Sequence, residues 1–299
     1  MTANTSHATG LWRWVELSRV HKFAGSMLIF WPFAWGLTMA ARSLSLPLQV
    51  YIFNLTYGLI GAALLHSAGC VWNDILDREF DRQVERTKHR PVADGRVSVP
   101  GALAFLAAHL VLLVAMLWPV KPLAWKLGLV TVFPLAGIYP LMKRVTYWPQ
   151  AWLGVAMNMI SLVAWSALHG RLASASGALI IGCWCWTLYY DTIYACQDKR
   201  DDVQAGVKST ALLFGVHVKK VLAVFAALLV ACLATAGTLN KQGVPYFVLT
   251  VGGTAAHLIL QLRNLDVDDT KSCLTAFESN GFTLGEIVWG GLFVDYIFG

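Results

Sequence analysis

The chain has 299 residues, of which 57% are hydrophobic and 13% are charged, and its mean hydropathy is +0.57. An ordinary soluble domain is less apolar and about twice as charged, so this composition indicates an integral membrane protein. The net charge of +6 comes from basic residues scattered between apolar segments, which argues against nucleic-acid binding and favours lipid headgroups or an anionic substrate.

Apolar stretches recur along the whole chain, separated by glycine, proline or charge. A helix that crosses a bilayer needs roughly 20 such residues. The stretches lie at about residues 23–41, 50–70, 101–119, 123–142, 151–168, 175–195, 221–239, 245–262 and 282–298. The sequence therefore predicts an all-α, multi-pass membrane protein of nine spans, with eight as the alternative, in a single domain over residues 1–299 that includes a short N-terminal segment at 1–22.

Basic residues are unevenly divided between the two sides that these spans define. The N-terminal segment and the loops after the even-numbered stretches hold 18 of the 23 Lys and Arg residues. Such an excess marks the cytoplasmic side, so we expect the N-terminus and these loops to be cytoplasmic. Neither a signal peptide nor a mitochondrial transit segment is recognisable, which favours the endoplasmic reticulum or another endomembrane. The six cysteines show no paired CxxC spacing, so neither zinc nor a disulfide framework is expected.

Two polar segments on this side interrupt the apolar chain, "VWNDILDREFDRQVERTKHRP" at 71–91 and "YYDTIYACQDKRDDVQAGVKST" at 189–210. In the first, Asn73, Asp77 and Asp81 recur every four residues and would share one face of a helix that continues from the second span. In the second, intervals of three and four again define one helix face, with Asp191, Tyr194, Asp198 and Asp202.

Rows of like charge at a span end have two interpretations. The simpler is that they are solvated helix ends. However, like charges four residues apart repel each other, and an ionisable group near the bilayer centre costs about 2.5–3.5 kcal/mol, so two such rows on one side favour a bound cation. Oxygen ligands without Cys or His suit a hard ion, magnesium before calcium, and magnesium commonly bridges carboxylates to phosphates. The sequence thus predicts a magnesium and diphosphate site, with a divalent-cation transporter as the non-enzymatic alternative.

At this level of detail a family resemblance emerges. "NDILDREFD" resembles the NDxxDxxxD signature, and "DTIYACQDKRDD" the DxxYxxxDxxxD signature, of the UbiA superfamily of intramembrane prenyltransferases. The likeness continues through "TKHRP" at 87–91, "YPLMKR" at 139–144, "WPQAWLG" at 148–154, "GVKSTALLFG" at 206–215 and "CLTAFESNGFTLG" at 273–285. It implies nine helices around a central cavity, whose cytoplasmic mouth binds an isoprenyl diphosphate through two magnesium ions.

The resemblance also implies a role for individual residues. Asn73, Asp77 and Asp81 would hold one metal ion, and Asp198 and Asp202 the other. Asp74, Asp191 and Asp201 would lie around them, and the candidate catalytic residues are Asp191 as a base, Tyr194 and Asp74. The candidate diphosphate-binding residues are Lys143, Arg144, Lys199 and Arg90, although positive-inside anchoring would also explain them. Tyr139, Tyr194 and some of the 13 tryptophans could stabilise an allylic cation, or simply pack.

The acceptor is the least determined part of the prediction. Relatives that prenylate 4-hydroxybenzoate typically carry Arg seven residues before the motif's Asn, where this chain has His66. Histidine lacks the two-pronged guanidinium that pairs with a carboxylate, although His66 could also be a packing residue. The residues of the first motif and its surroundings resemble those of fungal meroterpenoid prenyltransferases. This resemblance implies transfer of a farnesyl or related group to an aromatic polyketide or pyrone. A 4-hydroxybenzoate polyprenyltransferase and a haem-type farnesyltransferase are the alternatives of the same class.

Overall fold

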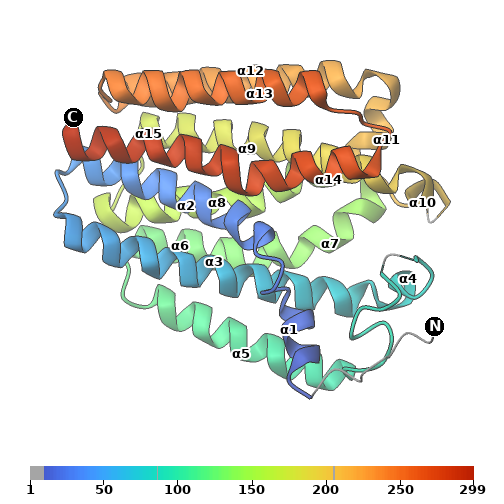
Figure 1. The fold of residues 1–299 in the computed structure, drawn as a ribbon. Coiled ribbons are helices and arrows are strands. Elements are labelled where there is room, and N and C mark those ends of the chain that lie inside the picture. Colours follow the sequence, from blue (N-terminus) through green and yellow to red (C-terminus); the bar gives the residue numbers. More distant parts are fainter. Residues whose placement is uncertain (1–9, 86, 205) are drawn as a thin grey trace.

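The computed structural model describes residues 10–85, 87–204 and 206–299, without the side chains at 200 and 201. The first nine residues of the expected N-terminal segment and the side chain of Asp201 are therefore outside the described part. The regular structure of the described residues is entirely helical, as the composition predicts (Figure 1). Its longer helices are α2 (Ala24–Ser43), α3 (Leu48–Leu76), α5 (Val99–Leu117), α6 (Pro122–Val130), α7 (Ala136–Val145), α8 (Pro149–His169), α9 (Ser174–Ala195), α12 (Val218–Leu239), α13 (Gly253–Asn264), α14 (Thr270–Ser279) and α15 (Gly285–Phe298).

Shorter elements join or interrupt these helices. They are α1 (Trp12–Ser18), α4 (Arg78–Asp81), α10 (Lys199–Gln204), α11 (Thr210–Phe214), the 3₁₀ turns η2 (Cys196–Asp198) and η3 (Gly215–His217), and the π-helical turns η1 (Thr131–Leu135), η4 (Tyr246–Gly252) and η5 (Asn280–Leu284). Within the described ranges, seven continuous helical stretches are long and apolar enough to cross a membrane. The expected spans at 175–195 and 245–262 form α9 and the η4–α13 helix, which are not among these seven. The chain is thus a multi-pass helical membrane protein.

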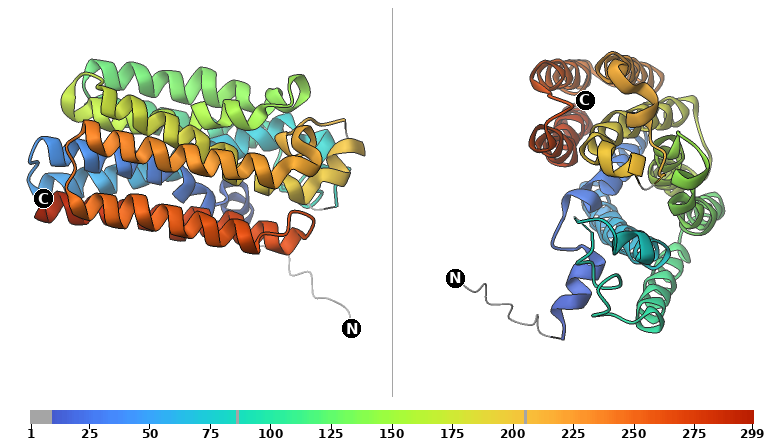
Figure 2. Two further views of the ribbon diagram at one scale, coloured as in Figure 1. Left: turned by 90° about the horizontal axis from the view of Figure 1, so that it is seen from above. Right: turned by 90° about the vertical axis from the view of Figure 1, so that its right-hand side faces the viewer.

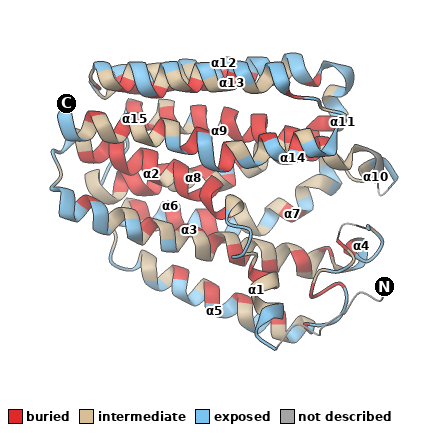
Figure 3. Ribbon diagram, viewed as in Figure 1, coloured by how far each residue is buried: buried red, intermediate tan, exposed pale blue. Residues whose placement is uncertain are grey.

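The centre of the bundle is built from α2, α8 and α9. Helix α2 packs against α3, α8 and α15, while α9 packs against α8 and α12. Burial follows this arrangement, because buried residues concentrate on α2, α8 and α9 while α5 and α12 keep exposed outer faces (Figure 3). Seen along the bundle, α5 and the α12–α13 pair lie at opposite sides of the molecule (Figure 2). The outermost helices therefore present the apolar side chains that contact lipid.

The π-helical turn η5 ties the C-terminal helices to this centre. A π turn takes an additional residue into the helix and leaves backbone groups without their usual i−4 partners. Here the Gly281 carbonyl accepts a hydrogen bond from Trp31 Nε1 at 2.8 Å, and Asn280 Oδ1 accepts one from Trp186 Nε1 at 2.9 Å. The turn therefore provides polar anchors for two buried tryptophans of α2 and α9.

Close packing of α2 on α8 depends on Gly36. A Cβ atom at this position would lie 2.5 Å from the Ser161 carbonyl oxygen, and backbone cannot move aside as a flexible side chain can. We expect Gly36→Ala to lower the free energy of unfolding by about 1–3 kcal/mol, the usual cost of overpacking. Thermal inactivation in detergent measures this. Gly177→Ala on α9, where a Cβ meets nothing within 4 Å, is the matched control, and equal loss in both variants would contradict the packing argument.

Both acidic segments lie at the same end of the bundle. Helices α4 and α10, which follow α3 and α9, lie together at this end, while the C-terminus and the α2–α3 connection lie at the other (Figure 1). The predicted continuous helix through the first segment is wrong. Helix α3 ends at Leu76, Asp77 is its C-cap with φ −95° and ψ 5°, and a new turn begins at Arg78. The helix is therefore interrupted at Asp77, in the middle of the acidic signature.

Candidate active site

A pocket of about 250 Å³ lies where the two acidic segments meet. Seven of the side chains predicted from the two signatures line it, namely Asn73, Asp77, Asp81, Asp191, Tyr194, Asp198 and Asp202. The second segment reaches the pocket through an interruption of its own, because α9 ends at Ala195 and the 3₁₀ turn η2 carries Asp198. The spacing therefore identified residues that gather in one pocket, although an unbroken helix face carries neither set.

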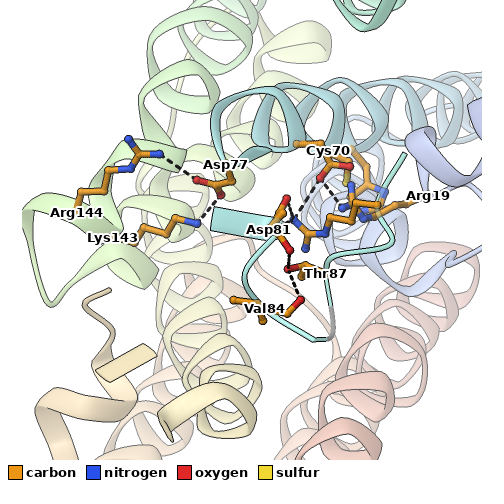
Figure 4. A network of polar contacts seen from close by, with 11 residues as sticks. Arg19, Cys70, Asp77, Asp81, Val84, Thr87, Lys143 and Arg144 are labelled. Atoms are coloured by element: carbon orange, nitrogen blue, oxygen red, sulfur yellow. Dashed lines mark hydrogen bonds and ion pairs between the residues drawn. The ribbon is translucent and has the colours of Figure 1, made fainter. Parts of the chain in front are cut away.

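Asp77 is the point where basic groups converge on the first segment. Its two carboxylate oxygens accept hydrogen bonds from Lys143 Nζ and, at 3.2 Å, from Arg144 Nη2 (Figure 4). Asp77 is 1% exposed, whereas Lys143 and Arg144 are 30% and 40% exposed. The final turn of α7 thus presents two cations to the pocket beside a buried carboxylate, and Lys143 itself lines the pocket.

A second group of charges lies on the other side of the first segment. Arg90 donates to both carboxylate oxygens of Asp81, at 3.0 and 2.9 Å, and contacts Asp74 at 3.3 Å. Arg19 donates to the same Asp74 oxygen at 2.6 Å. Burial raises the pKa of the Asp81 carboxyl, and the neighbouring Arg90 opposes this rise. Asp74 is buried but lines neither this pocket nor the one described next, so it holds the two arginines rather than facing the pocket.

Lys199 lies differently from the other predicted cations. Its Nζ is 2.6 Å from Asp268 in the loop between α13 and α14, and Lys199 is not among the residues that line the acidic pocket. A carboxylate of another loop therefore pairs with Lys199, and its diphosphate contact stays a prediction.

A second pocket of about 290 Å³ adjoins the first and is mainly apolar. Five residues line both pockets: Asn73, Arg90, Tyr139, Asp191 and Tyr194. The aromatic lining of the two pockets, as far as the chain is described, consists of Tyr139, Tyr190, Tyr194, Phe80 and Phe277 and includes no tryptophan, so the expectation that tryptophans face this space is wrong. Buried tryptophans instead pack between helices, as Trp35 does on Trp186 at 4.8 Å between ring centroids.

His66 lines the apolar pocket from α3. Its Nδ1 lies 3.1 Å from Ser26 Oγ, and its Nε2 lies 3.5 Å from Cys70 Sγ. Both ring nitrogens therefore already have neighbours on α2 and α3. His66 is thus a packed histidine that also lines the apolar pocket. Its position agrees with a packing residue and with a residue of the acceptor site.

Two cations of the site were not singled out from the sequence. Arg19 lines the apolar pocket, and Lys208 lines the acidic one. The Lys208 backbone N donates to the Lys143 carbonyl at 2.9 Å, and its Nζ donates to the Val145 carbonyl at 3.2 Å. Neither residue belongs to an acidic signature. Arg19 counts in the sequence as one of the positive-inside residues, and Lys208 lies in the segment 206–215 of the family resemblance without a role of its own. Only the tertiary fold shows that they reach a pocket.

The donor set suits a hard divalent cation in its chemistry. Oxygen ligands from both segments share one pocket without competing Cys or His, which matches the preference of magnesium. In the described residues no three His, Cys, Asp or Glu side chains converge closely enough to form a metal site, since Asp77 and Asp81 pair with Lys143, Arg144 and Arg90. A substrate anion that engages these cations would free the carboxylates for a metal.

A multi-pass helical bundle with an acid-lined pocket beside an apolar one has the construction of an intramembrane enzyme that handles an anionic head and an apolar chain. The model of the UbiA prenyltransferase family matches residues 29–285. The chain belongs to this family and is a prenyltransferase.

The relatives agree in class, since all of them are prenyltransferases. The UbiA prenyltransferase claS of Ampulloclitocybe clavipes is 57% identical over 95% of this chain and 90% of its own length. The mitochondrial 4-hydroxybenzoate polyprenyltransferase of Schizosaccharomyces pombe is 40% identical over 95% of this chain and 81% of its own length. Among solved structures, a UbiA homologue from Aeropyrum pernix K1 superposes with a TM-score of 0.75 at 22% identity, covering 90% of this chain and 97% of that one. This likeness establishes the shared fold.

Proposed function

We propose that this protein is a magnesium-dependent aromatic prenyltransferase of meroterpenoid biosynthesis, which moves a farnesyl or related isoprenyl group from its diphosphate to an aromatic polyketide or pyrone. The observation that carries the proposal is the meeting of both acidic segments in one pocket that shares five lining residues with an apolar pocket. A diphosphate fits the first pocket and an isoprenyl chain fits the second. The chain is 57% identical to the UbiA prenyltransferase claS and 40% identical to a 4-hydroxybenzoate polyprenyltransferase, and this difference supports an acceptor other than 4-hydroxybenzoate.

The residues around the acidic pocket have complementary roles in this proposal. Asn73, Asp77 and Asp81 would hold one magnesium ion, and Asp198 and Asp202 a second; a UbiA homologue from Archaeoglobus fulgidus has been solved with GPP and Mg²⁺. Bound magnesium supplies Lewis-acid stabilisation of the departing diphosphate. Lys143, Arg144 and Arg90 bind the phosphate oxygens as the carbon–oxygen bond breaks and its electron pair leaves with the diphosphate. Lys199 would join them only after release from Asp268.

The apolar pocket governs the second half of the reaction. Its lining excludes water from the allylic cation, and Tyr139 and Tyr194, which line both pockets, stabilise that cation through their rings. An acceptor ring carbon then forms the new bond, and the proton that this carbon loses passes to Asp191, which lines both pockets. Asp74 contributes by holding Arg19 and Arg90 in place.

The same proposal includes the topology. Nine spans would comprise the seven apolar helical stretches together with α9 and the η4–α13 helix, which surround the two pockets as a central cavity. The acidic pocket would face the cytoplasm, since most of the Lys and Arg residues lie on that side. The endoplasmic reticulum or another non-mitochondrial endomembrane is the proposed location.

A transfer assay separates this function from its alternatives. We expect purified protein in detergent, given Mg²⁺ and radiolabelled farnesyl diphosphate, to prenylate members of a panel of phenolic polyketides and pyrones. Chelation of the metal should abolish the product. Exclusive use of 4-hydroxybenzoate would establish the polyprenyltransferase alternative, which the 40% identical relatives favour. A transporter, which these relatives do not support, would show metal flux in liposomes and no prenylated product.

A further inference from the structure

Arg19 brings an unsatisfied hydrogen-bond donor to the apolar pocket. Its Nη2 donates to Asp74 Oδ1, whereas the buried Nη1 and the buried Asp74 Oδ2 make no hydrogen bond to the described residues, and the Cys70 thiol lies beside the guanidinium. Buried polar groups are almost always paired, so a buried guanidinium N–H without a partner at a pocket wall points to a group that the pocket receives. A single oxygen on a bound molecule would satisfy it.

The backbone at Arg19 is held in an unfavourable conformation. Its φ is 52°, in the left-handed region where glycine or asparagine is preferred, because Arg19 caps the C-terminus of α1. If this position served only to end the helix, glycine would adopt the left-handed conformation at a lower cost in free energy. Strained backbone persists where the side chain has a function that the fold must retain, which agrees with the position of the guanidinium.

The charges around the pocket are already balanced. Asp74 and Asp81 pair with Arg19 and Arg90, so two acids offset two arginines. The remaining carboxyl group of the lining, Asp191, is an acid and cannot pair with a ligand carboxylate as a cation would. A ligand carboxylate would therefore enter a mainly apolar pocket without a cation to spare for it, which is costly.

We propose that Arg19 binds the oxygen head of the aromatic acceptor through Nη1, and that this head is uncharged, a phenol hydroxyl or a ring carbonyl. This inference rests on the proposed function and narrows its acceptor class. An uncharged oxygen completes the hydrogen bonding of Arg19 without disturbing the balance with Asp74. Arg19 is thus the acceptor-specificity residue, at a position outside both acidic signatures.

Equilibrium binding tests the inference without requiring turnover. The probes are radiolabelled 4-hydroxybenzamide and 4-hydroxybenzoate, which share a shape and differ in charge. We expect the wild-type protein to bind the amide at least tenfold more tightly than the benzoate. Arg19→Gln should raise the Kd of the amide by about tenfold to a hundredfold, the value of a hydrogen bond from a charged donor. The Kd of farnesyl diphosphate should change much less, because Arg90 keeps both of its contacts with Asp81.

Three further variants exclude a purely structural role. Arg19→Asn tolerates the left-handed backbone and should lose amide binding while retained binding of farnesyl diphosphate shows that the variant is folded, and Arg19→Lys should restore only part of the amide binding. Lys22→Gln, an exposed cation three residues away, should bind as the wild type does. Equal binding of benzoate and amide by the wild type, or unchanged amide binding by Arg19→Gln, overturns the inference. Intact binding without any prenyl transfer would instead refute the proposed function alone.

Discussion

Asp77→Ala is expected to abolish prenyl transfer, lowering kcat on the order of a thousandfold or more. Asp77 is the most enclosed carboxylate of the acidic pocket and the one that Lys143 and Arg144 both contact. In the proposed function its removal takes away a magnesium ligand, and a metal-assisted step is worth several kcal/mol. It also leaves two cations without their shared partner. Both cations are partly exposed, so water can solvate them and the fold should survive. The assay is transfer from radiolabelled farnesyl diphosphate at saturating Mg²⁺.

Glu79→Ala is the matched control within the same segment. Glu79 is exposed, pairs with Arg78 and Arg82 on the surface, and does not line the pocket. This variant should retain nearly full activity, since exposed ion pairs contribute little. Asp198→Ala, from the second segment, should behave like Asp77→Ala. If Asp77→Ala turned over as fast as Glu79→Ala, the assignment of the metal and diphosphate to this pocket would be wrong.

The acidic signatures illustrate what the sequence could predict. Spacing alone placed Asn73, Asp77 and Asp81 on one side of the chain, and the pocket contains all three. The regular helix assumed for them was wrong because helix propensity and spacing do not report where a chain changes direction, and α3 ends at Leu76. The three residues nevertheless share a pocket, because side chains one turn apart can line the same pocket even when the helix is interrupted between them.

The basic residues show where prediction from sequence ends. Lys143 and Lys199 were both predicted from the sequence to bind the diphosphate. In the structure Lys143 contacts Asp77, whereas Lys199 pairs with Asp268. A long flexible side chain takes whichever carboxylate the tertiary fold brings within reach, and that choice depends on loops far apart in the chain. Arg19 was missed for the same reason, because its partner Asp74 is 55 residues away.

An ion pair at the opposite end of the bundle has a different kind of role. Arg42 at the end of α2 donates through Nε to Asp295 Oδ2 of α15 at 2.6 Å, and Asp295 is 0% exposed. The Gly243 backbone N donates to the other carboxylate oxygen at 2.9 Å. One carboxylate therefore joins α2, α15 and the connection between α12 and η4. It lines neither the acidic nor the apolar pocket, so its contribution is to stability.

Asp295→Ala should therefore lower stability by about 3 kcal/mol, near the lower end for a broken buried pair, because Arg42 is 19% exposed and can recover some hydration. Thermal inactivation in detergent measures the loss, while the KM for farnesyl diphosphate of the protein that remains folded should not change. Glu286→Ala, at an exposed position of the same helix, is the control. Replacing Arg42 and Asp295 together by leucine should recover most of the stability, since no charge is then left buried without a partner. A double variant no more stable than Asp295→Ala would show that the hydrogen bond to Gly243, and not the unpaired charge, accounts for the loss.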